Sequence, residues 1–168
     1  MKISGVHIWR GRSMSLDRTL EIGHLIGRLT RPGDVISLHG ELGAGKTQMV
    51  RGIAQGMGVQ DSVASPTYVL VHEYPTADRN LTLVHIDAYR MHDENDLESI
   101  GWGTQGRQEL RQDAVVAIEW AEKLEQTLGD DVLEVSLTHA GETARDITIA
   151  PRGKWVARMA ALRQELDR

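Results

Sequence analysis

Eight consecutive residues, Gly40 to Thr47, have the types and the spacing of a loop that binds phosphate. They read G-E-L-G-A-G-K-T and fit the pattern G-x-x-x-x-G-K-T. Glycines let the backbone curl so that several N–H groups point at one anion. The Lys46 ammonium can reach β- and γ-phosphates, and the Thr47 hydroxyl can ligate Mg²⁺. The loop predicts nucleotide contacts from Glu41, Leu42, Gly43, Ala44, Gly45, Lys46, Thr47 and Gln48.

The elements that such a loop requires flank it in the sequence. Residues 34–39 are a short β-branched run, which predicts a strand. Residues 46–55 are good helix formers and end before Gly56 and Gly58, which predicts a helix. The positive dipole end of this helix would lie at the loop. The alternative is a ligand-free glycine-rich turn, but such a turn has no use for Lys-Thr at this spacing.

Two acidic residues follow other predicted strands. Asp87 ends the run at 81–86, and Glu119 ends the run at 114–118. In an open α/β sheet, ligands collect outside the carboxyl ends of the strands, so we expect both carboxylates near the phosphates. Turnover of a nucleotide needs a metal and a group that orients the attacking molecule. Each carboxylate could instead cap the turn that follows its strand.

The segment Ser65-Pro66-Thr67-Tyr68 lies after the predicted helix of the nucleotide unit. A hydroxyl at Thr67 could bind Mg²⁺ or a γ-phosphate oxygen and release it after hydrolysis, as switch segments do. An ordinary proline-containing turn is the alternative. A metal site formed by His85, Asp87 and His92 has little support, because a strand-end histidine is more often structural.

Composition narrows the class of protein. The 168 residues fit one domain with an apolar core. The absence of cysteine excludes disulfides and thiolate metal sites, and without G-x-S-x-G or N-K-x-D segments neither serine hydrolysis nor guanine recognition is supported. The net charge of −5 argues against a protein that grips nucleic acid by its phosphates alone. With no long apolar run, we expect a cytoplasmic protein without membrane contact.

The remaining patterns predict an α/β fold with a mixed, mostly parallel sheet. Ser15 can cap a helix that runs to about Leu29, with an apolar stripe that begins at Leu16. The basic tail suggests either a solvated helix face or a contact with a partner or with RNA carried by a partner. The other expected elements are a strand at 6–9, paired strands at 68–74 and 81–86, a short acidic helix from Asp93, a helix at 121–128, paired strands at 132–138 and 146–150, and a basic C-terminal helix at about 153–167.

Four segments together resemble the TsaE (YjeE) family of bacterial ATPases in tRNA threonylcarbamoyladenosine synthesis. They are HGELGAGKT, SPTYVLVHEY, HIDAYRM with its acidic continuation, and IEW at 118–120. The resemblance spans residues 15–150 and implies a P-loop NTPase-like three-layer sandwich that binds ATP or ADP with Mg²⁺ and hydrolyses ATP weakly alone. It also implies a TsaB–TsaD heterodimer as partner, through which tRNA is held indirectly.

The functional residues of the family carry over one by one. Its metal contacts fall on Thr47 and Glu119, its Walker-B-type aspartate on Asp87, and its switch threonine on Thr67. With Lys46, these residues make up the expected catalytic set. Trp120 matches a family tryptophan, whereas Gln48 stands where the family often has Thr or Ser.

Two other functions fit the same loop. A small-molecule kinase would need an acceptor pocket and usually an arginine-rich lid, for which Arg107 and Arg111 are the clustered candidates. A nucleotide-sensing adaptor would bind its partner in a nucleotide-dependent way even without hydrolysis. Arg145 could approach the nucleotide from the late hairpin, but it is not among the expected site residues.

Overall fold

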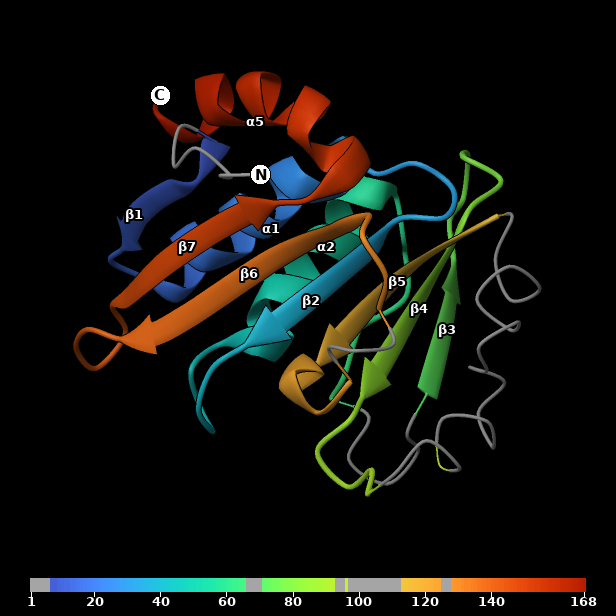
Figure 1. Ribbon diagram of the computed structural model, residues 1–168, viewed down its shortest axis with the longest axis horizontal. Coiled ribbons are helices and arrows are strands. Elements are labelled where there is room, and N and C mark those ends of the chain that lie inside the picture. Colours follow the sequence, from blue (N-terminus) through green and yellow to red (C-terminus); the bar gives the residue numbers. More distant parts are fainter. Residues whose placement is uncertain (1–6, 66–70, 93–95, 97–112, 125–127) are drawn as a thin grey trace.

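The framework of the protein is a seven-stranded mixed sheet in the order β1-β7-β6-β2-β5-β4-β3 (Figure 1). The computed structural model describes residues 7–65, 71–92, 96, 113–124 and 128–168. The central strands β6, β2, β5 and β4 are parallel, and antiparallel strands lie outside them. This arrangement confirms the predicted α/β fold with a mixed sheet. The strands are β1 (Trp9–Ser13), β2 (Val35–His39), β3 (Val71–Pro75), β4 (Thr82–Asp87), β5 (Ala114–Glu119), β6 (Val132–His139) and β7 (Arg145–Pro151).

Helices and loop segments cover the two faces of this sheet. The helices α1 (Leu16–Arg28) and α2 (Lys46–Met57) share a core with one face, and the C-terminal helix α5 (Met159–Leu166) extends this core beside α1 (Figure 1). The segments that follow β4 and β5 pack on the opposite face through Ala88, Met91, Leu124 and Leu128. The three layers agree with the predicted sandwich.

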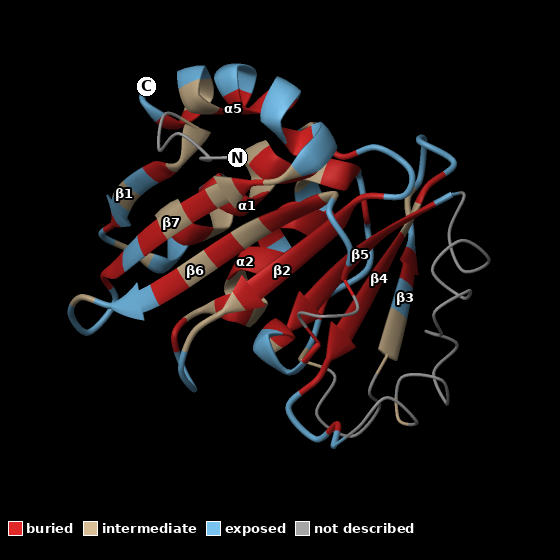
Figure 2. Ribbon diagram, in the orientation of Figure 1, coloured by how far each residue is buried: buried red, intermediate tan, exposed pale blue. Residues whose placement is uncertain are grey.

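The central strands are buried on both sides, as a continuous apolar run requires. All six residues of β5 are buried, and they alternate between the two cores: Val115 and Ala117 face one, Val116 and Ile118 the other (Figure 2). The edge strand β3 is less buried, with two exposed, two half-buried and one buried residue. Because β4 and β5 are parallel neighbours, their carboxyl ends meet at the same edge of the sheet.

Helices α1 and α2 touch backbone to backbone. Gly23 and Gly27 of α1 face Gly52 and Gly56 of α2, and a Cβ atom on any of them would overlap main-chain atoms of the other helix. Since α2 begins at the phosphate-binding loop, this contact fixes the direction of the helix whose N-terminus points at the site. The predicted apolar stripe of α1 is partly wrong, because Leu16 is exposed.

We expect Gly52→Ala to destabilise the protein by about 1–3 kcal/mol, because an added methyl group would overlap the Leu20 carbonyl oxygen. The sign of the change in unfolding free energy tests the packing, because glycine to alanine in an unconstrained helix stabilises a protein by about 0.5–1 kcal/mol. Urea unfolding would measure the difference. The matched control is Gln55→Ala, an exposed position of the same helix, with an expected change within about 0.5 kcal/mol. A Gly52→Ala protein as stable as wild type would contradict this packing.

Several predicted elements match the structure and others differ. Ser15 caps α1 by accepting a hydrogen bond from the Arg18 N–H, and the two predicted hairpins are present as β3–β4 and β6–β7. The opening strand lies at Trp9–Ser13 instead of 6–9, because this stretch pairs with β7. The expected acidic helix from Asp93 and residues 68–70 lie outside the described residues, apart from Asp96.

The helix predicted at 121–128 is wrong over its described beginning. A single 3-10 turn, η2 (Ala121–Lys123), follows β5 and ends at Leu124. Trp120 precedes this turn and has a φ of 58°, in the left-handed region that residues other than glycine rarely adopt. The resulting sharp bend seats Leu124 on the core of the second face.

The basic tail is fastened to the domain by its arginines. A 3-10 segment, η4 (Gly153–Arg158), precedes α5, so the predicted tail helix is only partly α-helical. Arg158 is buried and forms two hydrogen bonds to the Asp34 carboxylate, at 2.6 and 2.7 Å. Arg163 donates to the Ile8 carbonyl oxygen. A purely solvated basic face is therefore the wrong interpretation of the tail.

No helix within the described ranges combines the length and the apolar character needed to cross a membrane.

Candidate phosphate-binding site

The loop between β2 and α2 has the backbone form that its glycines predict. Gly43 and Gly45 have φ values of 77° and 101°, in the left-handed region that glycine adopts without strain. Gly45 is the N-cap of α2, and no side chain among the described residues caps this helix end. The first N–H groups of a helix have no partner within the helix. They are therefore available to an anion in front of the loop.

Lys46 lies buried at the centre of the loop. Its Nζ atom donates to the carbonyl oxygens of Gly40 at 2.5 Å and Glu41 at 2.9 Å, and it lies 4.0 Å from the centroid of the Trp120 ring. Burial lowers the pKa of Lys46, and the negative charges of nearby carboxylates, Glu119 foremost, oppose that shift. The ammonium is thus partly desolvated, and its hydrogen-bond acceptors among the described residues are neutral carbonyl oxygens. A phosphate would be a stronger partner for it.

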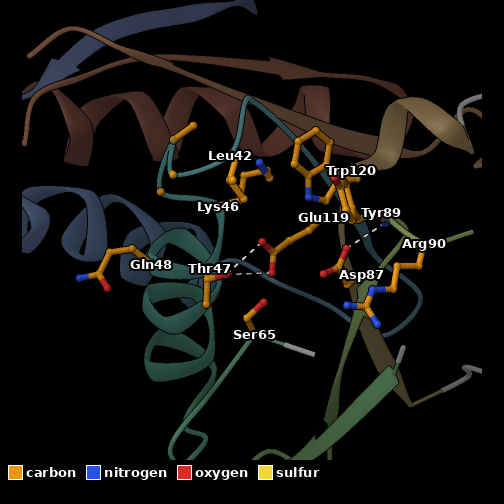
Figure 3. A pocket seen from close by; sticks show the side chains of 13 residues that line it. Leu42, Lys46, Thr47, Gln48, Ser65, Asp87, Tyr89, Arg90, Glu119 and Trp120 are labelled. Carbon is orange, nitrogen blue, oxygen red and sulfur yellow. Dashed lines mark hydrogen bonds between the residues drawn. The ribbon is translucent and has the colours of Figure 1, made fainter. Parts of the chain in front are cut away.

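Thr47 and Glu119 meet although they are far apart in the sequence (Figure 3). The Thr47 hydroxyl lies 3.0 and 3.1 Å from the two carboxylate oxygens of Glu119. The buried His85 holds the same carboxylate from behind, with its Nε2 atom 2.5 Å from Oε2. A hydroxyl and a carboxylate at one point form a set of oxygen ligands that suits Mg²⁺.

Asp87 lies beside Glu119 because the two residues are register partners on β4 and β5. The pKa of Asp87 is raised, first because burial disfavours its charge and also because Glu119 is nearby; the hydrogen bond from the Tyr89 N–H, at 2.9 Å, acts in the opposite direction. Keeping two carboxylates close together costs stability in the absence of a cation. Such a pair is suited to neutralisation by bound Mg²⁺ and by Lys46.

We expect Asp87→Asn to raise the unfolding temperature of the nucleotide-free protein, with a gain of about 1 kcal/mol at pH 7. The folded-state pKa of Asp87 lies above the ordinary value of about 3.9, so folding binds a proton and the stability of wild type falls as pH rises between the two values. The advantage of the variant should therefore be largest near neutral pH and should vanish below about pH 4.

Thermal unfolding between acidic and neutral pH would measure this difference. Asp61→Asn, at an exposed position, is the matched control and should leave the pH dependence unchanged. A lower unfolding temperature for Asp87→Asn at neutral pH would show that the Asp87 charge stabilises the site.

Aromatic and basic side chains form the rim of the site. The rings of Tyr89 and Trp120 lie 4.9 Å apart between centroids, and Tyr89 is 54% exposed. The Lys123 Nζ donates to the Tyr89 carbonyl oxygen and also lies over the Tyr89 ring. The left-handed backbone of Trp120 directs its indole toward Lys46. The rim thus joins the segment after β4 to the segment after β5.

These groups enclose a cavity of about 310 Å³ in front of the loop (Figure 3). Lys46, Thr47, Asp87 and Glu119 all lie on it. Its lining residues are Leu42, Gly43, Ala44, Gly45, Lys46, Thr47, Gln48, Ser65, Asp87, Tyr89, Arg90, Glu119 and Trp120. The fold has therefore brought a phosphate loop and two strand-end carboxylates into one cavity.

A protein-family model described as "Threonylcarbamoyl adenosine biosynthesis protein TsaE" matches residues 13–147. The chain belongs to the TsaE family. The family is named for tRNA threonylcarbamoyladenosine biosynthesis, and its model covers the loop and both strand-end carboxylates. The segments that carry the resemblance in the sequence are all inside this match.

Known TsaE proteins resemble the chain over most of its length. The protein named tRNA threonylcarbamoyladenosine biosynthesis protein TsaE from Bacillus subtilis strain 168 is 36% identical over 157 residues, which cover 94% of this chain and 92% of that protein. The protein of the same name from Treponema pallidum is 36% identical and covers 82% of this chain and 97% of its own. The crystal structure of Bacillus subtilis YdiB superposes with a TM-score of 0.68 at 32% identity and covers 95% of this chain and 94% of that one.

Two of the residues expected to act in this TsaE chain are placed differently or are not described. Glu41 does not line the cavity in front of the loop; it lines a neighbouring one of about 400 Å³ with His39 and His139, and its carbonyl oxygen accepts a hydrogen bond from Lys46. Thr67 lies outside the described residues, as do Arg107 and Arg111. Ser65, close to Thr67 in the sequence, lines the cavity. The role of Thr67 stays a prediction.

Sequence reasoning missed several groups of this TsaE site. His85 has a structural role, as predicted, but its partner, the Glu119 carboxylate, was not expected. The available signal was its spacing from Asp87: residues two apart on a strand share a face. Tyr89 and Arg90 also line the cavity. They lie in the HIDAYRM segment that carries the family resemblance, but the sequence analysis assigns no role to them. Arg145 is not a lining residue, because its guanidinium lies behind the loop and binds loop carbonyls.

Proposed function

We propose that this TsaE chain is a Mg²⁺-dependent ATPase that acts with a TsaB–TsaD complex in the threonylcarbamoyladenosine modification of tRNA. The observation that carries the proposal is the meeting of Thr47 and Glu119 at the uncapped start of α2, beside the Lys46 ammonium. A nucleoside triphosphate with Mg²⁺ needs free backbone amides, a cation and a pair of oxygen ligands at one point. Membership in the TsaE family supports the pathway.

Each residue of the site has a distinct task in this proposal. The loop amides and Lys46 would bind the β- and γ-phosphates, and Lys46 would exchange its two carbonyl acceptors for phosphate oxygens. Thr47 and Glu119 would hold Mg²⁺, which neutralises charge on the phosphates when bound. His85 would keep the Glu119 carboxylate in place.

Two further residues would act during turnover. Asp87, beside Glu119, would contact the metal site directly or through water. Thr67 would sense the γ-phosphate and release it after hydrolysis, which would reset the partner complex. The tRNA would be held chiefly by the partners, because the chain carries a net charge of −5.

The test is calorimetry of the purified chain with ATP and ADP in the presence of Mg²⁺, followed by an ATPase assay with and without TsaB–TsaD. We expect both nucleotides to bind and the partners to raise turnover. A pull-down with TsaB–TsaD in ATP, in ADP and without nucleotide should show nucleotide-dependent association.

Other outcomes of the same experiments identify the alternatives. Phosphate transfer to a metabolite instead of water would indicate a kinase. Nucleotide-dependent association that survives in a hydrolysis-deficient Glu119→Ala variant, with no effect on the modification reaction, would indicate an adaptor. No uptake of adenine nucleotide by the chain or by its complex would overturn the proposal.

A further inference from the structure

The end of the β6–β7 hairpin forms hydrogen bonds with the back of the phosphate loop. Arg145, the first residue of β7, donates from Nε to the Ala44 carbonyl oxygen at 2.9 Å and from a terminal nitrogen to the Gly43 carbonyl oxygen at 3.0 Å. His139, its direct partner across the hairpin, has Nε2 3.3 Å from the Leu42 carbonyl oxygen. Three consecutive carbonyls of the loop are thus held by one cross-strand pair.

Holding these carbonyls also sets the direction of the amides that follow them. In a trans peptide the C=O and the next N–H point in opposite directions, and the described peptides are all trans. The Ala44 carbonyl turned toward Arg145 therefore directs the Gly45 N–H away from Arg145. The Gly43–Ala44 peptide is held at both ends, because the Ala44 N–H donates to the Glu41 carbonyl oxygen at 3.0 Å.

Arg145 is built into this position. Only 7% of the residue is exposed, and its remaining terminal nitrogen donates to carbonyl oxygens of the hairpin turn, at Gly141, Glu142 and Ala144. Among the described residues, the partners of its guanidinium are carbonyls, and no carboxylate forms an ion pair with it. A buried cation without a counter-ion is costly. A phosphate in front of the loop would provide the missing negative charge.

We propose that Arg145 is a positioning residue for phosphate binding. It fixes the loop so that the Gly45 N–H, which follows the held Ala44 carbonyl, faces the anion, and it adds positive charge behind the loop without touching the nucleotide. The inference rests on the proposed ATPase function and assigns to this site a residue outside the sequence motif. It also makes the turn at 140–144 a part of the nucleotide site, since the same guanidinium binds both segments.

The experiment is calorimetry and steady-state ATPase assays of Arg145→Ala and Arg145→Lys. We expect Arg145→Ala to bind ATP with Mg²⁺ about 10- to 100-fold more weakly, because charged hydrogen bonds to two loop carbonyls are lost. KM should rise more than kcat falls, since Arg145 does not contact the γ-phosphate. Arg145→Lys should be intermediate, because an ammonium restores the charge but cannot replace the planar fork that spans two carbonyls.

Chemical rescue separates positioning from a general loss of folding. Low-millimolar guanidinium should restore ATP affinity to Arg145→Ala, whereas the same concentration of sodium chloride should not. Arg12→Ala is the matched control, because Arg12 is an exposed arginine that pairs with the next residue of the hairpin, Asp146, and it should bind ATP as wild type does. If Arg145→Ala does not fold, the ATP affinity of Arg145→Lys is compared with that of wild type instead.

The outcomes distinguish this inference from the proposed function. Wild-type binding together with unchanged affinity in Arg145→Lys and Arg145→Ala would overturn the positioning role and leave the ATPase proposal intact. Arg145→Lys equal to wild type while Arg145→Ala is weak and is not rescued would show that charge alone matters, and would also overturn positioning. Failure of wild type to bind ATP would overturn the proposed function and this inference with it.

Discussion

Replacement of Lys46 by alanine should lower ATP turnover at least about 100-fold, the loss typical when one preorganised donor to a developing charge is removed. Lys46 is the buried cation on the cavity floor, and its ammonium is already partly desolvated. It therefore gains more from a phosphate than a solvated lysine would. Without it, the amides of the loop and the metal ligands would carry the triphosphate charge alone.

The measurement is an ATPase assay with TsaB–TsaD present, together with calorimetry of ATP binding by the variant alone. Lys154→Ala is the matched control, since it removes one positive charge from an exposed residue of the tail and should retain full turnover. Thermal unfolding of both variants would show that any loss comes from the site and not from misfolding. Wild-type turnover in Lys46→Ala would remove the proposed ATPase mechanism.

Replacement of Arg158 by alanine should destabilise the protein by about 3–5 kcal/mol, the usual cost when one partner of a buried ion pair is removed. The side chains of Arg158 and Asp34 are only 7% and 8% exposed, and the guanidinium also donates to the Leu29 carbonyl oxygen at 2.8 Å. It also lies over the Trp155 ring, with 3.8 Å between Cζ and the ring centroid. Alanine would leave the Asp34 carboxylate buried without its cation.

Urea unfolding of Arg158→Ala, Asp34→Ala and the double variant would measure this effect and the coupling between the two residues. The double variant should be more stable than the sum of the single losses predicts, because it leaves no unpaired charge. Arg168→Ala, which breaks the exposed pair with Glu165, is the control and should cost no more than about 1 kcal/mol. A loss of no more than about 1 kcal/mol in Arg158→Ala would show that the pair of Arg158 and Asp34 does not anchor the tail.

The two positions illustrate different uses of buried cations in one small domain. Arg158 has its counter-ion within the protein, and the pair fastens the C-terminal tail to the start of β2. Lys46 and Arg145 are bound to carbonyl oxygens, on opposite sides of the same loop. We expect the pair of Arg158 and Asp34 to stabilise the fold, and we propose that Lys46 and Arg145, which form no ion pair among the described residues, are prepared for an anionic ligand.

What could be predicted from the sequence was local. The spacing of Gly40, Lys46 and Thr47 identified the loop, because its chemistry depends on consecutive residues whose backbone curls over one anion. The Ser15 cap and the start of α2 were equally readable, since each depends on contacts within a few residues. Asp87 and Glu119 could be placed near the loop because parallel strands end at the same edge of a sheet.

The tertiary structure alone decided how these parts are held. Thr47 meets Glu119 across 72 residues, and Arg145 meets Ala44 across 101, so no window of sequence contains either pair. The left-handed turn at Trp120 and the backbone contact between Gly23 and Gly52 have no local signature for the same reason. Hydrogen bonds and packing depend on distance in space, and a chain brings distant residues together only when its elements pack. The sequence by itself therefore determined which groups could bind a nucleotide, while the packed fold determined which residues orient them.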